Sequence, residues 1–117
     1  MGLTASPPGH DLVWDRGQDL AHIITLPMGT YLPATSWALE FSVTHPVTGA
    51  ALFTKTVGSG VTITTAGSTT IDAVFTIAVA DTDTDAALTT LSYNWKFKRT
   101  DNGSEVNIDG GKVRFTR

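Results

Sequence analysis

The feature that most constrains this chain is an apolar residue at every second position over two stretches of its second half. The apolar positions in residues 71–79 and 92–98 are Ile71, Ala73, Phe75, Ile77, Val79, Tyr93, Trp95 and Phe97. Successive side chains of a β-strand point to opposite faces, so this period places all eight on one side of two strands. The pattern predicts two half-buried strands whose apolar residues face a common core.

The rest of the chain repeats the pattern in shorter segments. Further strands are predicted at residues 11–15, 20–26, 36–44, 51–57, 61–65, 105–108 and 112–116. In residues 20–26 the inward set is either Leu20, His22, Ile24 and Leu26, which we favour, or Ala21, Ile23 and Thr25. Turn residues recur about every ten positions, and a Gly110-Gly111 break is predicted before the last strand. The sequence predicts an all-β fold, an immunoglobulin-like antiparallel β-sandwich.

One short helical turn is predicted between two of the strands, at residues 82–88, with Asp81 as the N-cap residue. Asp81, Asp83 and Asp85 also resemble the start of a calcium loop. Such a loop needs glycine at its sixth position and glutamate at its twelfth, where this chain has Ala86 and Ser92. A capped corner without a metal is therefore the interpretation.

Composition and motifs argue against several classes of function. The net charge of −3 disfavours a specific nucleic-acid binder, although six of the eight basic residues lie in the last 22 positions. The chain has no cysteine and no apolar run of the ~20 residues that span a bilayer. No nucleophile elbow, P-loop or zinc-protease motif is present, which predicts a non-enzymatic protein without cofactor or membrane partner. A small hydrolase is a minor alternative, which would need a polar cleft with a perturbed carboxylate or histidine.

Residues 1–10 are predicted to form an extended arm and residues 11–117 the β-sandwich domain. The arm carries a Pro-Pro-Gly break, and a second irregular segment, residues 27–35, is interrupted by Pro27, Gly29 and Pro33. Aromatic residues in such segments either anchor a protein or sugar partner or cap the core. The candidate partner-binding residues are Ser6, Pro7, Pro8, Trp14, Tyr31 and Leu32.

The segment from the helical turn to Tyr93 resembles the E–F region of immunoglobulin-like sandwiches. There, a tyrosine near the start of a strand bonds back to the backbone a few residues upstream. The resemblance implies a hydrogen bond between the Tyr93 hydroxyl and the backbone of residues 85–88.

A wider resemblance covers about residues 11–116. Its motifs are WDRGQDL at 14–20, WALEFSVT at 37–44, KTVGSGVTI at 55–63, DT at 81–82 and YNWKFKRTDNG at 93–103. Together they resemble small β-sandwich proteins of tailed bacteriophages, including the N-terminal domain of upper baseplate proteins. This implies a structural component of the virion, assembled in the host cytoplasm, as a capsid decoration or a neck, tail or baseplate accessory. Its expected partners are other virion proteins and copies of itself. A carbohydrate-binding module that takes a host glycan is the alternative.

Overall fold

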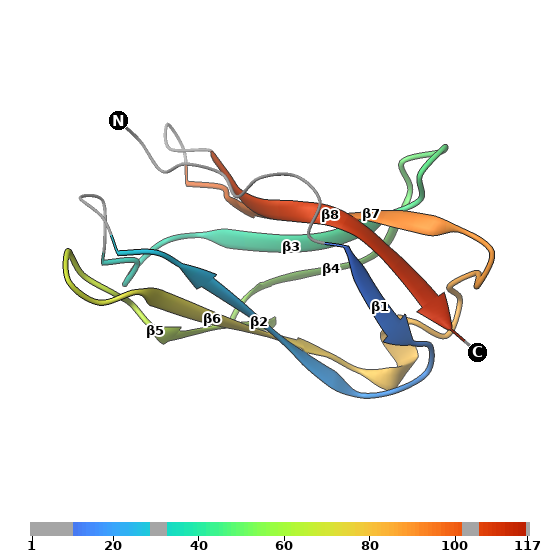
Figure 1. The fold of residues 1–117 in the computed structure, drawn as a ribbon, viewed down its shortest axis with the longest axis horizontal. Coiled ribbons are helices and arrows are strands. Elements are labelled where there is room, and N and C mark those ends of the chain that lie inside the picture. The colour runs from blue at the N-terminus through green and yellow to red at the C-terminus, as the bar shows by residue number, and fades with distance from the viewer. Residues whose placement is uncertain (1–10, 29–32, 102–105, 117) are drawn as a thin grey trace.

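The computed structural model describes residues 11–28, 33–101 and 106–116, which form eight strands of a single mixed, curled sheet (Figure 1). The order across the sheet is β1-β8-β7-β3-β4-β5-β6-β2. The strands are β1 (Leu12–Asp15), β2 (Leu20–Leu26), β3 (Leu39–Thr44), β4 (Ala51–Val57), β5 (Gly60–Thr65), β6 (Ala73–Val79), β7 (Ser92–Arg99) and β8 (Val106–Thr116). The predicted all-β class is confirmed.

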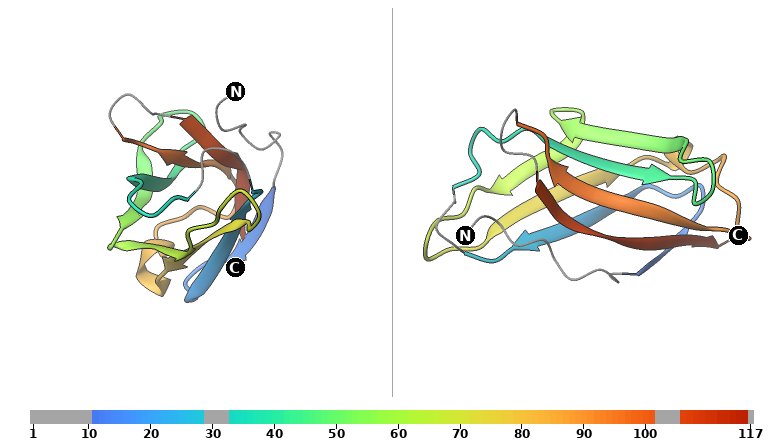
Figure 2. Two further views of the ribbon diagram at one scale, coloured as in Figure 1. Left: turned by 90° about the vertical axis from the view of Figure 1, so that its left-hand side faces the viewer. Right: turned by 90° about the horizontal axis from the view of Figure 1, so that it is seen from above.

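The sheet curls into a half-barrel, so its inner side encloses the core (Figure 2). Two parts of it, β1-β8-β7-β3-β4 and β5-β6-β2, are joined through a β4–β5 ladder of only two residue pairs. Ring contacts connect these parts across the inside. The ring centroids of Phe75 on β6 and Phe97 on β7 are 5.2 Å apart, and those of His22 on β2 and Trp95 on β7 are 5.4 Å apart.

The prediction of an antiparallel sheet is wrong at two strand pairs. β1 runs parallel to β8, and β4 runs parallel to β5. The first pair joins strands from opposite ends of the chain, so no hairpin connection forces them to run antiparallel. The second is a tight turn in which Thr56 pairs with Gly60, four residues further along.

The alternation predicted which side chains enter the core. The inward set of β2 is confirmed, with Ile24 and Leu26 buried and Leu20 and His22 half-buried. The largest side chains of the core are almost fully buried, and burial of each such group stabilises the fold by roughly 1.5–3 kcal/mol. They are Trp95, Phe41, Phe75, Phe97 and Phe115.

Two predicted strands begin two or three residues before the observed ones. β6 begins at Ala73, so Ile71 lies outside it and is 57% exposed. β3 begins at Leu39, because the Ala38 amide donates to the Asp101 side chain instead of extending the ladder. Trp37 nevertheless packs in the core, so it keeps the predicted burial without belonging to a strand.

The predicted break at Gly110-Gly111 is wrong, because β8 runs through both residues. Gly110 pairs with Lys96 and Gly111 with Trp95. A Cβ atom at Gly110 would lie 3.0 Å from the Trp95 carbonyl oxygen, so the missing side chain permits close pairing. A glycine pair in a strand can therefore mark close backbone approach rather than a turn.

The helical turn is shorter than predicted. It is a 3₁₀ turn, η1 (Asp81–Asp83), with Ala80 rather than Asp81 at the N-cap position. The Ala80 amide donates to the Asp83 carboxylate at 2.7 Å, and the Lys55 ammonium group lies 2.7 Å from the same oxygen. Within the described residues, no helix is long and apolar enough to cross a membrane.

The predicted tyrosine hydrogen bond is present. The Leu88 amide donates to the hydroxyl oxygen of Tyr93 at 2.9 Å, and the Tyr93 side chain is buried.

The β1–β2 turn is bonded to the same corner. The Gly17 amide donates to the Thr84 hydroxyl at 2.8 Å, and Arg16 donates to the Ala87 carbonyl at 3.1 Å. These bonds hold the start of β2 against the segment between β6 and β7.

Tyr93→Phe should lower the free energy of unfolding by about 1–2 kcal/mol, because the Leu88 amide loses its acceptor while the ring still fills the core. Chemical denaturation measures this difference. Ser92→Ala, at the exposed neighbouring position of β7, is the matched control and should change stability by less than about 0.5 kcal/mol. Equal stabilities for Tyr93→Phe and the wild type would contradict the assigned bond.

Gly67→Ala should destabilise the protein more than Gly49→Ala. Gly67 and Gly49 have similar positive φ angles, +79° and +75°. An alanine should therefore cost the same backbone strain at both positions, about 1–2 kcal/mol. A Cβ at Gly67 would lie 2.8 Å from the Ala73 amide nitrogen, whereas one at Gly49 meets nothing within 4 Å. The clash should add about 1–3 kcal/mol to the loss of unfolding free energy at Gly67. Equal losses would show that the Gly67 turn moves to admit the methyl group.

Candidate interaction surfaces

Among the residues proposed from sequence to bind partners, Trp14 lies within the described structure. Its half-buried indole faces the core, with its centroid 5.6 Å from that of His22 on β2 and 6.1 Å from that of Phe115 on β8. Trp14, on the edge strand β1, thus packs against the other edge strand, β2, as the core-capping alternative predicts. The other proposed positions, Ser6, Pro7, Pro8, Tyr31 and Leu32, lie outside the described residues.

Aromatic side chains give no exposed cluster for a sugar in the described part of the chain. There, every tryptophan, phenylalanine and tyrosine is buried, except the half-buried Trp14. The predicted glycan site therefore depends on Tyr31, which is not described. Also within the described ranges, no group of three or more His, Asp or Glu side chains could hold a metal ion.

Strand β2 forms one edge of the sheet, and its sequence lacks the usual protection of an edge. It pairs with β6 without a bulge, from Leu20 opposite Val79 to Leu26 opposite Ala73. None of its seven residues is charged or proline. Natural edge strands are usually short or bulged, or carry lysine or proline, which hinder pairing with another chain. Among the described residues, no strand occupies the other side of β2, so this part of the structure presents a long edge that is open to a partner strand.

The outer face beside this edge is also uncharged. We call the outward residues of β2, β5 and β6 the uncharged face; they are Ala21, Ile23, Thr25, Thr62, Thr64, Val74, Thr76 and Ala78. Ile23 is 54% exposed, and the hydroxyl groups of Thr64 and Thr76 lie 2.7 Å apart. The alternation in the sequence located these outward positions. Nothing in it showed that β2 would be an edge strand.

The opposite outer face carries four of the eight basic residues of the chain. We call the outward residues of β7 and β8 the cationic face; its basic members are Lys96, Lys98, Lys112 and Arg114. The Lys98 ammonium lies 3.5 Å from the Glu40 carboxylate, and that of Lys112 donates to Asn94 at 2.5 Å. Four of the six basic residues in the C-terminal sequence thus share one face of the described structure.

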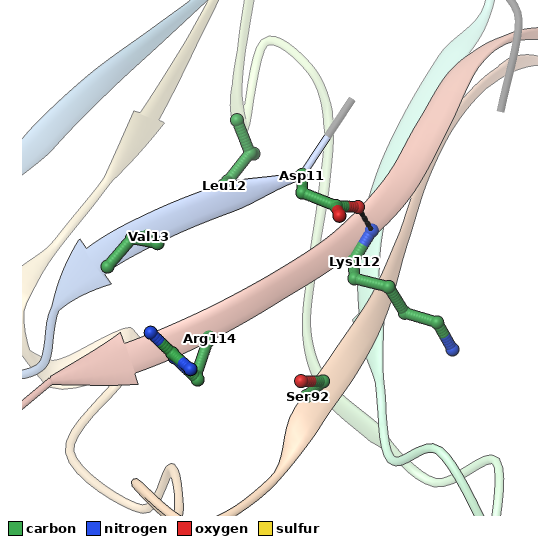
Figure 3. Close-up of a pocket in the computed structure, with 6 residues that line it drawn as sticks. All are labelled: Asp11, Leu12, Val13, Ser92, Lys112 and Arg114. Atoms are coloured by element: carbon green, nitrogen blue, oxygen red, sulfur yellow. Dashed lines mark hydrogen bonds between the residues drawn. The ribbon is translucent and has the colours of Figure 1, made fainter. Parts of the chain in front are cut away.

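A shallow pocket of about 250 Å³ lies on this side, at the junction of β1, β7 and β8 (Figure 3). Its lining residues are Asp11, Leu12, Val13, Ser92, Lys112 and Arg114. The Asp11 carboxylate accepts the Lys112 backbone amide at 3.3 Å, and the Lys112 ammonium points away from Arg114 in Figure 3. The pocket's carboxylate thus helps to attach β1 to β8.

A compact ion pair holds the end of β7 against the segment before β3. The Arg99 guanidinium donates twice to one Asp101 oxygen, at 2.8 and 3.0 Å, and lies 4.4 Å from the centroid of the Trp37 ring. The other Asp101 oxygen accepts the Ala38 amide. The hydrogen bond from Arg99, followed by that from Ala38, holds the pKa of Asp101 below its usual value.

The Asp101 contacts predict an acid-dependent loss of stability. A carboxyl group whose pKa is lower in the folded state stabilises the fold above its unfolded pKa, about 4, and this contribution disappears as the pH falls through the folded pKa. Asp101→Asn removes the titrating charge. Denaturation at pH 6 and pH 3 should therefore show the wild type more stable than the variant at the higher pH, with a smaller difference at the lower pH. A difference independent of pH would contradict the pair.

No protein-family model matches the sequence, and no curated protein is significantly similar to it.

Proposed function

We propose that this protein is non-enzymatic and acts through protein–protein contacts at the β2 edge and the uncharged face. The observation that carries the proposal is the open edge of β2, seven residues long and without a charge, proline or bulge. The unpaired backbone groups of such an edge accept a partner strand by β-augmentation, in which main-chain hydrogen bonds supply affinity. The uncharged face next to it can pack against the same partner without desolvating a charge.

The finer fold within this proposal is an immunoglobulin-like sandwich. Immunoglobulin domains have strand neighbours B-E-D in one sheet and C-F-G in the other. Here the neighbours β2-β6-β5 and β3-β7-β8 have the same order along the chain. The two-pair ladder between β4 and β5 then joins two facing layers at one side. The Leu88–Tyr93 hydrogen bond supports the same assignment.

The proposed setting is the particle of a tailed bacteriophage, as a capsid decoration or a neck, tail or baseplate accessory. This part of the proposal rests on the sequence resemblance described above. Residues 1–10 would add contacts to neighbouring virion proteins. Repeated copies in a symmetric particle would strengthen weak single contacts through avidity.

Mass spectrometry of purified particles tests this proposal. The protein should be present, in hundreds of copies for a capsid location and in a few to tens for a tail location. Ile23→Lys, which places an ammonium group at the centre of β2's outer side, should reduce incorporation at least about tenfold, equivalent to about 1.4 kcal/mol of binding.

Thr54→Lys is the matched control, because Thr54 is an exposed outward residue of β4 in the other part of the sheet. It should leave incorporation unchanged. Absence of the protein from the particles would overturn the virion setting, and normal incorporation of Ile23→Lys would overturn the role of the β2 edge.

A further inference from the structure

The open edge of β2 is suited to a strand of similar length. The sheet order ends at β2, so β6 occupies one side of its backbone and no strand of the described structure pairs with the other. At about 3.3 Å per residue, the edge is about 23 Å long. β1 and β2 diverge from the turn that connects them, which leaves the Leu26 end of the edge away from β1 (Figure 1).

Charge favours a second copy of the chain as the occupant. Two cationic faces placed together would oppose Lys96, Lys112 and Arg114 with their own copies, and like charges in contact cost binding energy. Two copies that meet at β2 and the uncharged face bring no charged outward residue of these strands together. The carboxylates that flank these strands, Asp19 and Asp72, accept the backbone amides of Asp81 and Met28, so the strands themselves offer no charge to an acidic or basic partner. β2 and the uncharged face can therefore contact the same surface of a second copy without repulsion between like charges.

The side-chain spacing also fits a two-fold axis. When a strand pairs antiparallel with its own copy, the contact is isologous and one position lies at the axis. Ile23 is central among the outward residues of β2, with Ala21 and Thr25 two positions to either side. An axis at Ile23 brings together two isoleucine side chains that are each 54% exposed in the monomer and removes apolar area from water.

A competing occupant is the N-terminal segment of the chain itself. Pro7 and Pro8 of that segment have no amide hydrogen, so neither can donate to a ladder with β2. A second β2 has no proline, so every amide that faces its free edge can donate. The second copy is accordingly the better partner for the full length of the edge.

We propose that two copies of this chain pair antiparallel along β2, with the two-fold axis near Ile23, and join their sheets into one continuous sheet. Pairing between copies presupposes the proposed function, because it identifies the partner of the β2 edge.

Single-cysteine variants of the full chain test the pairing, since the natural sequence has no cysteine. Directly opposed residues of an antiparallel pair have Cβ atoms about 4.5–5.5 Å apart, close to disulfide geometry. Mild oxidation of Ile23→Cys should therefore give a covalent dimer, and Thr54→Cys, the matched exposed control on β4, should not.

Light scattering should show that the wild type is a dimer. Dimerisation of Ile23→Lys should be at least about tenfold weaker, equivalent to about 1.4 kcal/mol. Near-ultraviolet circular dichroism of the buried tryptophans verifies that each variant is folded.

Three results would overturn the β2 pairing. The first is a wild type that stays monomeric up to millimolar concentration. The second is cross-linking of Thr64→Cys in place of Ile23→Cys, which would show that the uncharged faces stack without edge pairing. The third is dimerisation only after residues 1–10 are removed, which would identify that segment as the occupant. A monomeric wild type whose incorporation into particles is still lost in Ile23→Lys would overturn the pairing alone and leave the proposed function intact.

Discussion

The structure depends on the packing of aromatic rings across the inside of one curled sheet. Hydrogen bonds between strands hold each part of the sheet together, but the ladder between β4 and β5 has only two residue pairs. The two parts face each other because rings from both meet in the core, as Phe75 meets Phe97 and His22 meets Trp95. Apolar burial of this size is the main favourable contribution to folding, so it determines how far the sheet curls.

The corner beside η1 connects this core to the edge of the sheet. Leu88 is bonded to the Tyr93 hydroxyl, and the β1–β2 turn is bonded to Thr84 and Ala87 nearby. The carboxylate of Asp83 caps η1 and also receives Lys55 from β4. The acidic segment therefore has a structural role, in which the Asp83 carboxylate binds the Ala80 amide and Lys55, and the Tyr93 hydroxyl binds the Leu88 amide. Its consequence for function is indirect: the corner places the start of β2.

The curl leaves two outer faces with different chemistry. Outward-facing residues do not have to be apolar. Lysine and arginine lie on the outer side of β7 and β8, whereas threonine, alanine, valine and isoleucine lie on the outer side of β2, β5 and β6. Charged residues keep a face hydrated and disfavour its contact with a like face. β2 and the uncharged face carry no charged side chain, so a protein partner can contact these strands without desolvating a charge on them.

The sequence by itself determined the class of fold, most strand positions and the inward residues, because a period of two and a turn residue between strands are local properties of a chain. The resemblance to the E–F region of immunoglobulin-like sandwiches predicted the Tyr93 bond, whose partners are five residues apart. Only the tertiary structure decided that β1 joins β8 in parallel, that Gly110 continues a strand, and that β2 is an edge. Each of these depends on which distant segment lies alongside, and that choice follows from packing of the whole core rather than from neighbouring residues.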